Sequence, residues 1–159
     1  MSEVPPITGV AEIVLSVADL PAMRQFYVDV LGFPLHSEIS MESDTPDPDG
    51  EATISFLTIQ PLETPLGLRH PQLLVLIDYQ RHVFARQRLQ GHDVTRSTLN
   101  HLAFEIPPHA YTDHLTRLQQ LQLNPVETEF PDMLARALFF RDPEGNVLEL
   151  ICRNPATLD

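Results

Sequence analysis

The chain of 159 residues contains no lysine, because all ten of its basic residues are arginine. This excludes Schiff-base chemistry, a pyridoxal-phosphate anchor and a phosphate-loop lysine. The Gly-x-Ser-x-Gly and Gly-x-Gly-x-x-Gly patterns are absent as well. The single cysteine, Cys152, lies in a segment with the pattern of a buried strand, where a nucleophile is poorly exposed. Histidines and carboxylates remain as the groups able to do chemistry.

Positive charge is also scarce, and the net charge of −12 argues against binding to nucleic acid. No apolar run approaches the length that spans a bilayer. The first ten residues lack the basic-then-apolar layout of a secretory signal. A lone cysteine cannot form an internal disulfide, which agrees with a reducing compartment. We therefore expect a soluble, cytoplasmic domain without nucleic-acid or membrane partners.

Hydrophobic periodicity in the first half predicts a strand, a helix and three more strands. Ala11–Ala18 alternates as a strand does. Asp19 is a suitable cap for the helix that follows, and Gly32 is a suitable stop. The later strands are expected at Leu35–Ser40, Glu51–Ile59 and Gln72–Tyr79, with an exposed acidic loop between the first two.

Residues 80–98 form a connector that contains four arginines and one acid. We interpret it as a solvated segment with a helical turn in its first half, and a phosphate or carboxylate site is the alternative. The arginines are Arg81, Arg86, Arg88 and Arg96.

The second half repeats the order of elements. Its periodicity predicts a hairpin turn in which Gly145 takes a positive φ. The expected elements are a strand at Asn100–Ile106, a helix at Pro108–Leu121, and strands at Pro125–Thr128, Ala135–Arg141 and Asn146–Cys152.

An internal repeat organises the chain. Placing Glu12 over His101 (101 − 12 = 89) also places Leu15 over Phe104. Each half is then a βαβββ module, at about residues 8–79 and 99–153. We predict a single α+β domain in which the two modules form one curved mixed sheet around a concave pocket, with the helices outside.

Side-chain alternation places three polar residues on the pocket face of this sheet. In the strands at Ala11–Ala18 and Asn100–Ile106, the apolar parity faces the helix, which leaves Glu12 and His101 on the other face. The same parity places Glu149 inward in the last strand. A carboxylate within an apolar strand is costly unless it is paired or bound to a metal. One histidine and two glutamates can bind a divalent ion and leave positions open for substrate.

Three segments resemble the vicinal oxygen chelate (glyoxalase/bleomycin-resistance/dioxygenase) superfamily. HLAFEI at 101–106 and FFRDPEGNVLEL at 139–150 are similar to its second-module signature, and residues 11–33 are similar to its first-module signature. The resemblance implies paired βαβββ modules, a frequent homodimer and, in enzymes, a divalent metal (Mn, Ni, Fe, Zn or Mg) that chelates substrate oxygens. Its metal ligands fall on Glu12, His101 and Glu149.

The chain departs from this family pattern at two positions. The first-strand ligand is usually histidine but is Glu12 here, so the His-His-carboxylate set of an iron extradiol dioxygenase is missing. A fourth ligand would be sought near Val75, where the strand is apolar until Asp78. Metal-free pairing of His101 with Glu149, and of Glu12 with an arginine, is the alternative.

Other polar and aromatic residues near the expected pocket have open roles. Arg136 and Arg141 are candidates to hold an anionic substrate, or to pair with external carboxylates. Phe139 and Phe140 lie where extradiol enzymes often carry a tyrosine, and His70 is a candidate for the pocket mouth. The remaining histidines are expected at the surface, namely His36, His82, His92, His109 and His114.

Three functions follow from these residues. The first is a metal-dependent lyase or isomerase, in which the ion polarises a substrate oxygen and a carboxylate, Glu12 or Glu149, moves the proton. The second is an extradiol-type ring-cleaving dioxygenase. The third is a metal-free protein that binds a drug or metabolite, as bleomycin-resistance proteins do.

Overall fold

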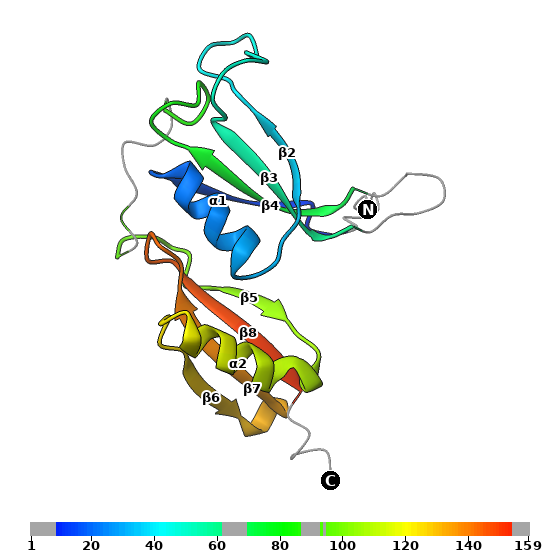
Figure 1. Ribbon diagram of the computed structural model, residues 1–159. Helices are drawn as coiled ribbons and strands as arrows, with labels where there is room; N and C mark the ends of the chain where they lie inside the picture. Colours follow the sequence, from blue (N-terminus) through cyan, green and yellow to red (C-terminus); the bar gives the residue numbers. More distant parts are fainter. Residues whose placement is uncertain (1–8, 62–69, 87–92, 94, 154–159) are drawn as a thin grey trace, which may run out of the picture. The chain divides into compact units, whose positions relative to one another are not determined.

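The structure is a computed structural model that describes residues 9–61, 70–86, 93 and 95–153. The chain divides into two compact units, residues 1–92 and 93–159. Within its described residues, each unit contains one four-stranded sheet and one α-helix (Figure 1). The tandem βαβββ modules and the α+β class are therefore confirmed. The curved sheet and concave pocket depend on how the modules join, and they remain predictions.

The first module has the strand order β1-β4-β3-β2, in which β4 lies between β1 and β3 (Figure 1). The β1–β4 pair is parallel and the other pairs are antiparallel. Its elements are β1 (Glu12–Val17), α1 (Leu20–Asp29), β2 (Leu35–Ile39), β3 (Ile54–Gln60) and β4 (Gln72–Asp78). β3 begins three residues later than expected, because the acidic loop extends that far.

Local chemistry sets both ends of α1. The Asp19 carboxylate accepts the N–H of Ala22 at 3.0 Å, a cap that stabilises a helix by about 1 kcal/mol. Gly32 has φ +73°, a conformation that residues with a side chain rarely adopt, and it therefore ends the helix. Met23 and Tyr27 are fully buried on the helix, as are Leu57 and Leu74 in the sheet. These side chains form the core of the first module.

The connector begins with the expected helical turn, in which the Arg86 N–H donates to the His82 carbonyl at 3.0 Å. Arg81 bonds to the Glu42 carboxylate at 2.6 Å and to the Glu51 carboxylate at 2.8 Å. The hydrogen bond to Glu42 raises the pKa of Arg81, burial opposes this shift, and the charges of Glu51 and Glu42 add to it. Arg81 therefore links the acidic loop to the start of the connector.

Two other connector arginines have different outcomes. Arg96 lies 3.6 Å from Asp93. Arg88 lies outside the described residues.

The second module repeats the topology with the order β5-β8-β7-β6. The expected helix at Pro108–Leu121 opens as a 3-10 turn over Pro108–Ala110, and the α-helix begins after it. The middle strand, β6, is longer than expected and reaches Phe130. The α-helix and strands are β5 (Leu102–Glu105), α2 (Tyr111–Gln120), β6 (Val126–Phe130), β7 (Ala135–Arg141) and β8 (Val147–Arg153).

The hairpin between β7 and β8 is tied by one side chain. Asp142 accepts the N–H of Glu144 at 3.0 Å and the side-chain amide of Asn146 at 2.7 Å. Gly145 has φ +89°, as its place in the turn predicts.

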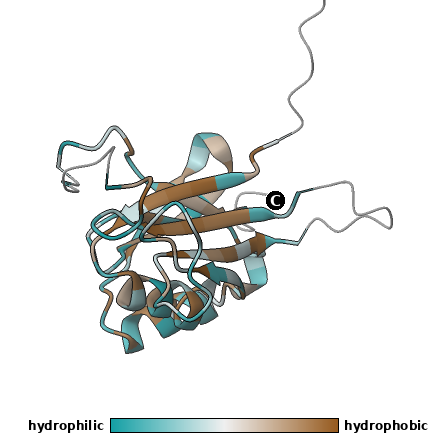
Figure 2. Cartoon of the chain, turned by 90° about the horizontal axis from the view of Figure 1, so that it is seen from above, coloured by the Kyte–Doolittle hydropathy of each residue, from teal (hydrophilic) through white to brown (hydrophobic). Residues whose placement is uncertain are grey.

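Figure 2 shows that hydrophobic residues are concentrated along the strands. Among the described residues, no helix has the length and apolar character needed to cross a membrane.

Candidate functional site

In β1, alternate side chains separate into a core face and an open face. Leu15 and Val17 are buried, whereas Glu12 is exposed and Val14 is 52% exposed. The register aligns Glu12 with Leu73 of β4. The structure therefore places Glu12 on the face opposite the α1 core.

In the second module, β5 and β8 present His101 and Glu149 to the same side of the sheet. Glu149 aligns with Ala103, two residues after His101, while the buried Leu102 and Leu148 align on the other face. His101 directly precedes β5, which is two residues shorter at this end than expected.

Glu149 is a buried carboxylate that pairs with His101. Only 6% of the Glu149 side chain is exposed, and its Oε2 lies 3.0 Å from His101 Nε2. A buried carboxylate without a partner would cost several kcal/mol. The pairing of Glu149 with His101 therefore stabilises the second module, and the histidine is also a candidate ligand.

Asn100 determines which nitrogen of His101 bears hydrogen. Its Oδ1 lies 2.6 Å from His101 Nδ1, and an amide oxygen only accepts hydrogen bonds. Nδ1 is thus the donor, so the lone pair of a neutral ring lies on Nε2 and faces the Glu149 carboxylate. Two acceptors at this distance need a proton or a metal ion between them.

The residues of this pair fit a divalent metal. Two ligand atoms bonded at about 2.1 Å to one ion lie about 3.0 Å apart when the bonds meet at a right angle. His101 and Glu149 have that separation. Metal-binding histidines commonly donate the other ring N–H to an oxygen, as His101 does to Asn100. A protonated imidazole fits the same distance, so geometry alone admits either cation.

An open, largely apolar hollow of about 530 Å³ lies in the second module, and neither His101 nor Glu149 lines it. Phe139 lines it and meets the His101 ring edge-on, with centroids 5.7 Å apart. Val126 and Val147 contribute apolar surface, and Arg141 contributes a guanidinium. The guanidinium donates to the Gly145 carbonyl at 2.6 Å and has no carboxylate within 4.0 Å among the described residues.

Glu12 has a neighbour that the alternation pattern did not reveal. His70 Nε2 lies 3.8 Å from Glu12 Oε1, and both side chains are partly exposed. His70 Nδ1 lies 2.6 Å from the Pro71 carbonyl, to which it donates.

Arg136 does not belong to the open face, which corrects one of its two expected roles. Its guanidinium carbon lies 3.9 Å from the centre of the Tyr111 ring, on the α2 side of the sheet. Burial, together with a hydrogen bond to Glu127, raises the pKa of the Tyr111 hydroxyl to about 12. Arg136 therefore stabilises the second module and cannot hold a substrate at the open face.

His82 was expected at the surface, and this expectation is wrong. It is 3% exposed, and its Nδ1 accepts the Phe84 N–H at 3.3 Å. Burial lowers its pKa, which the nearby Asp78 partly opposes. Burial also lowers the pKa of His114, with Arg117 acting in the same direction. His92 lies outside the described residues.

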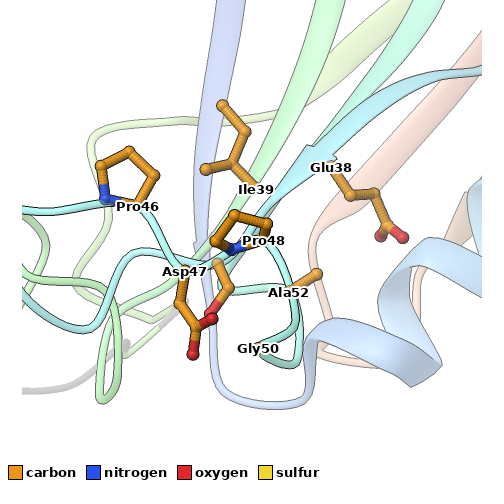
Figure 3. Close-up of a pocket in the computed structure, with 8 residues that line it drawn as sticks. Glu38, Ile39, Pro46, Asp47, Pro48, Gly50 and Ala52 are labelled. Atoms are coloured by element: carbon orange, nitrogen blue, oxygen red, sulfur yellow. The ribbon is translucent and has the colours of Figure 1, made fainter.

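A second hollow, of about 320 Å³, lies in the acidic loop (Figure 3). Pro46, Asp47 and Pro48 line it from the loop. Glu38, at its rim, is held by Arg24 at 2.6 Å and by the Ser55 hydroxyl. Unlike the first hollow, it has no described lining residue in ring contact with a candidate site residue, so we assign it to loop structure.

The described residues contain no group of three or more His, Cys, Asp and Glu side chains close enough to hold a metal. Glu12 belongs to the first compact unit, and His101 and Glu149 belong to the second. The convergence of all three therefore remains a prediction.

Sequence reasoning missed Asn100 and the pairing of His70 with Glu12. Asn100 lies just outside β5, where the alternation pattern no longer applies. His70 lies outside any alternating strand, so periodicity gave no signal for it.

Comparison with known proteins identifies the family. Solved structures with the same fold include lactoylglutathione lyase from Agrobacterium tumefaciens, with TM-score 0.59, 20% identity, and 92% of this chain and 94% of that chain covered. FosX, a fosfomycin resistance protein from Listeria monocytogenes, has TM-score 0.62 and 17% identity, with 96% and 98% covered. A variant of FosX (TM-score 0.63, 18% identity, 96% and 98% covered) was solved with Mn(II) and 1S,2S-dihydroxypropylphosphonic acid.

No curated protein sequence matches the chain. The family model described as "Glyoxalase/Bleomycin resistance protein/Dioxygenase superfamily" matches residues 9–150. The chain belongs to this superfamily.

Proposed function

We propose that this protein is a metal-dependent lyase or isomerase of a small molecule, with a divalent ion held by Glu12, His101 and Glu149. The proposal treats the two modules as one domain that works as a homodimer in the cytoplasm. The buried Cys152, 4% exposed, agrees with a reducing compartment.

The observation that supports the proposal best is the pair formed by His101 and Glu149. A neutral histidine that donates through Nδ1 to Asn100 presents the lone pair of Nε2 to a buried carboxylate 3.0 Å away. A divalent ion satisfies both atoms at once and needs no second proton on the ring.

The carboxylates have different tasks in this proposal. A bound divalent ion would supply polarisation of a substrate carbonyl or enolate oxygen. Glu149 is buried against His101, so its main task is to hold the site. Glu12, whose side chain is 37% exposed, is better able to reach a substrate C–H and move its proton.

The hollow lined by Phe139, whose ring contacts His101, is the candidate site for a small substrate. Its volume of about 530 Å³ lies in the usual range for small-molecule sites. Phe139 and Val126 offer apolar contact, and Arg141 offers a positive charge at the rim. We assign to Arg141 the anionic end of the substrate, a carboxylate or a phosphonate. The Mn(II) and phosphonic acid bound to the FosX variant make manganese the first ion to test.

The metal-free binding protein is the second candidate. His101 and Glu149 also suit a hydrogen-bonded ion pair, since 3.0 Å is an ordinary N–H···O distance. Ring-cleaving oxygenation is disfavoured, because Phe139, which contacts His101, has no hydroxyl to act as an acid.

Metal analysis tests the proposal. Protein purified without chelators should contain about one divalent ion per chain, and Glu149→Gln should remove most of it. Glu105→Gln is the matched control, because Glu105 is an exposed carboxylate on the same face of β5. A metal-free wild type that also fails to take up Mn²⁺, Ni²⁺, Zn²⁺ or Fe²⁺ would transfer the assignment to a binding protein.

A further inference from the structure

Arg141 ends β7 at the hollow of about 530 Å³ in the second module. The alternation of β7 places Arg141 on the same face as Phe139, and its register partner in β8 is Val147. All three residues line the hollow. Among the described residues that line it, Arg141 is the only one with a charged side chain. A ligand in this hollow therefore meets apolar surface and one positive charge.

One nitrogen of the Arg141 guanidinium is already held by the β7–β8 hairpin. Its Nη1 donates to the Gly145 carbonyl at 2.6 Å. Gly145 belongs to the turn that Asp142 ties together, since Asp142 accepts the N–H groups of Glu144 and Asn146. This attachment limits the motion of the guanidinium before a ligand arrives, so less conformational entropy is lost on binding.

The edge of the guanidinium formed by Nε and Nη2 is available for a ligand. In the described part of the chain, neither nitrogen has a hydrogen-bond partner, and no carboxylate lies within 4.0 Å of the group. The two N–H groups of this edge point in parallel and match the two oxygens of a carboxylate. The edge therefore offers the two donors and the single positive charge that one carboxylate requires.

The charge of the hollow favours a carboxylate over a phosphate or phosphonate. A phosphoryl group presents three acceptor oxygens and about 1.5–2 negative charges near neutral pH. Arg141 alone would leave part of this charge uncompensated in a chain whose net charge is −12. Gln122 and Asn124 on the lining add hydrogen-bonding groups but no positive charge. One arginine neutralises one carboxylate.

The apolar lining indicates the rest of the ligand. Phe139 lies two residues before Arg141, about 7 Å along the strand, and its register partner in β6 is Val126. A ligand whose carboxylate is at Arg141 therefore has its body against Phe139, where an aromatic or branched aliphatic group fits. Phe139 also contacts the His101 ring, with centroids 5.7 Å apart, so the body extends toward the pair of His101 and Glu149.

We propose that the hollow binds a small monocarboxylate with an apolar body, and that Nε and Nη2 of Arg141 bind its carboxylate bidentately. This inference rests on the proposed function, because it takes the hollow as the substrate site, and it narrows the anionic end of the substrate to a carboxylate. All the residues that carry it belong to the second compact unit.

Titration of the full chain with phenylacetate tests the proposal, with benzylphosphonate and the neutral phenylacetamide as matched probes. The protein is freed of metal and then of chelator, so that no bound ion can hold the carboxylate. By NMR, phenylacetate should bind the wild type more tightly than either matched probe does, with Overhauser contacts from its ring to the methyl groups of Val126 and Val147. Arg141→Gln should weaken phenylacetate binding by about tenfold or more. Arg141→Lys should weaken it nearly as much, because an ammonium group has no planar fork.

Arg153→Gln is the matched control. Arg153 is an exposed arginine of β8 that also donates to a main-chain carbonyl, that of Met133 at 3.3 Å, and it does not line the hollow. This variant should bind phenylacetate as the wild type does. Thermal melting of each variant checks that it is folded.

Each part of the proposal has its own contrary result. Absence of phenylacetate binding to the wild type at millimolar concentrations overturns the proposal, as does equal binding by the wild type and Arg141→Gln. Binding of benzylphosphonate or phenylacetamide at least as tight as that of phenylacetate overturns the choice of a carboxylate, and full affinity in Arg141→Lys overturns the bidentate contact. Carboxylate binding by a chain that takes up no metal keeps this inference and overturns the proposed function. Metal uptake without carboxylate binding overturns this inference and leaves the metal-dependent function standing.

Discussion

Replacing Glu149 by glutamine should separate a metal site from a simple ion pair. Glutamine keeps the shape of the side chain and removes its charge. Because His101 Nδ1 donates to Asn100, its Nε2 can accept a hydrogen bond from the new amide. The apoprotein should therefore remain folded, with a melting temperature equal to or above that of wild-type apoprotein, since a buried charge is removed.

The response to metal should differ sharply between the two proteins. A ligand at 100 times its Kd stabilises the native state by about 2.7 kcal/mol, which for a chain of this size is about 5–11 °C in Tm. If the variant binds about 100-fold more weakly, the same concentration equals its Kd. The stabilisation then falls to about 0.4 kcal/mol, or about 1–2 °C.

The assay is thermal unfolding of both proteins in EDTA and in a series of Mn²⁺ and Ni²⁺ concentrations. Glu105→Gln should respond as the wild type does, because Glu105 is exposed and has no part in the site. Equal metal-induced shifts in the wild type and in Glu149→Gln would refute the reasoning. A variant much less stable than the wild type in EDTA would show that the pairing of Glu149 with His101 stabilises the apoprotein without a metal.

Two further predictions concern stability and assembly. Burial lowers the pKa of His82 below 6.5. The unfolded chain therefore binds the proton first as the pH falls, so the free energy of unfolding should decrease below about pH 6.5 until the pH reaches the folded pKa. Urea denaturation between pH 7.5 and 5.5 should show this slope, and His82→Gln should reduce it; an unchanged slope would assign it to other groups. The chain should also form a homodimer, because β1, β2, β5 and β6 are unpaired edge strands within their own sheets. Light scattering should give about twice the chain mass of 18.0 kDa, and a monomer at micromolar concentration would contradict this.

The sequence predicted the modules well where the residue type at a cap or turn and the hydrophobic period of the neighbouring segment indicate the same element. Asp19 and Gly32 bound α1, and Gly145 turns the β7–β8 hairpin, because each has a local requirement that few residue types meet. Alternation also separated the buried Leu15 and Val17 from the exposed Glu12. These features depend on residues close together in the chain.

Features that depend on tertiary contacts were harder to predict. His82 is buried because the turn after β4 packs inward, and no periodic pattern marks a turn. Arg136 stacks on Tyr111, which lies 25 residues earlier in the chain. The face of the sheet to which Arg136 belongs could therefore be recognised only once the position of α2 was known. The same holds for His70, whose pairing with Glu12 depends on the parallel register of β1 and β4.

The most direct test of the account is crystallography of the protein grown with Mn²⁺, with diffraction data collected to locate the metal by anomalous scattering. The account predicts one strong peak per chain within bonding distance of Glu12, His101 and Glu149. No peak, or a peak bound to other residues while His101 Nε2 stays hydrogen-bonded to Glu149, would contradict it.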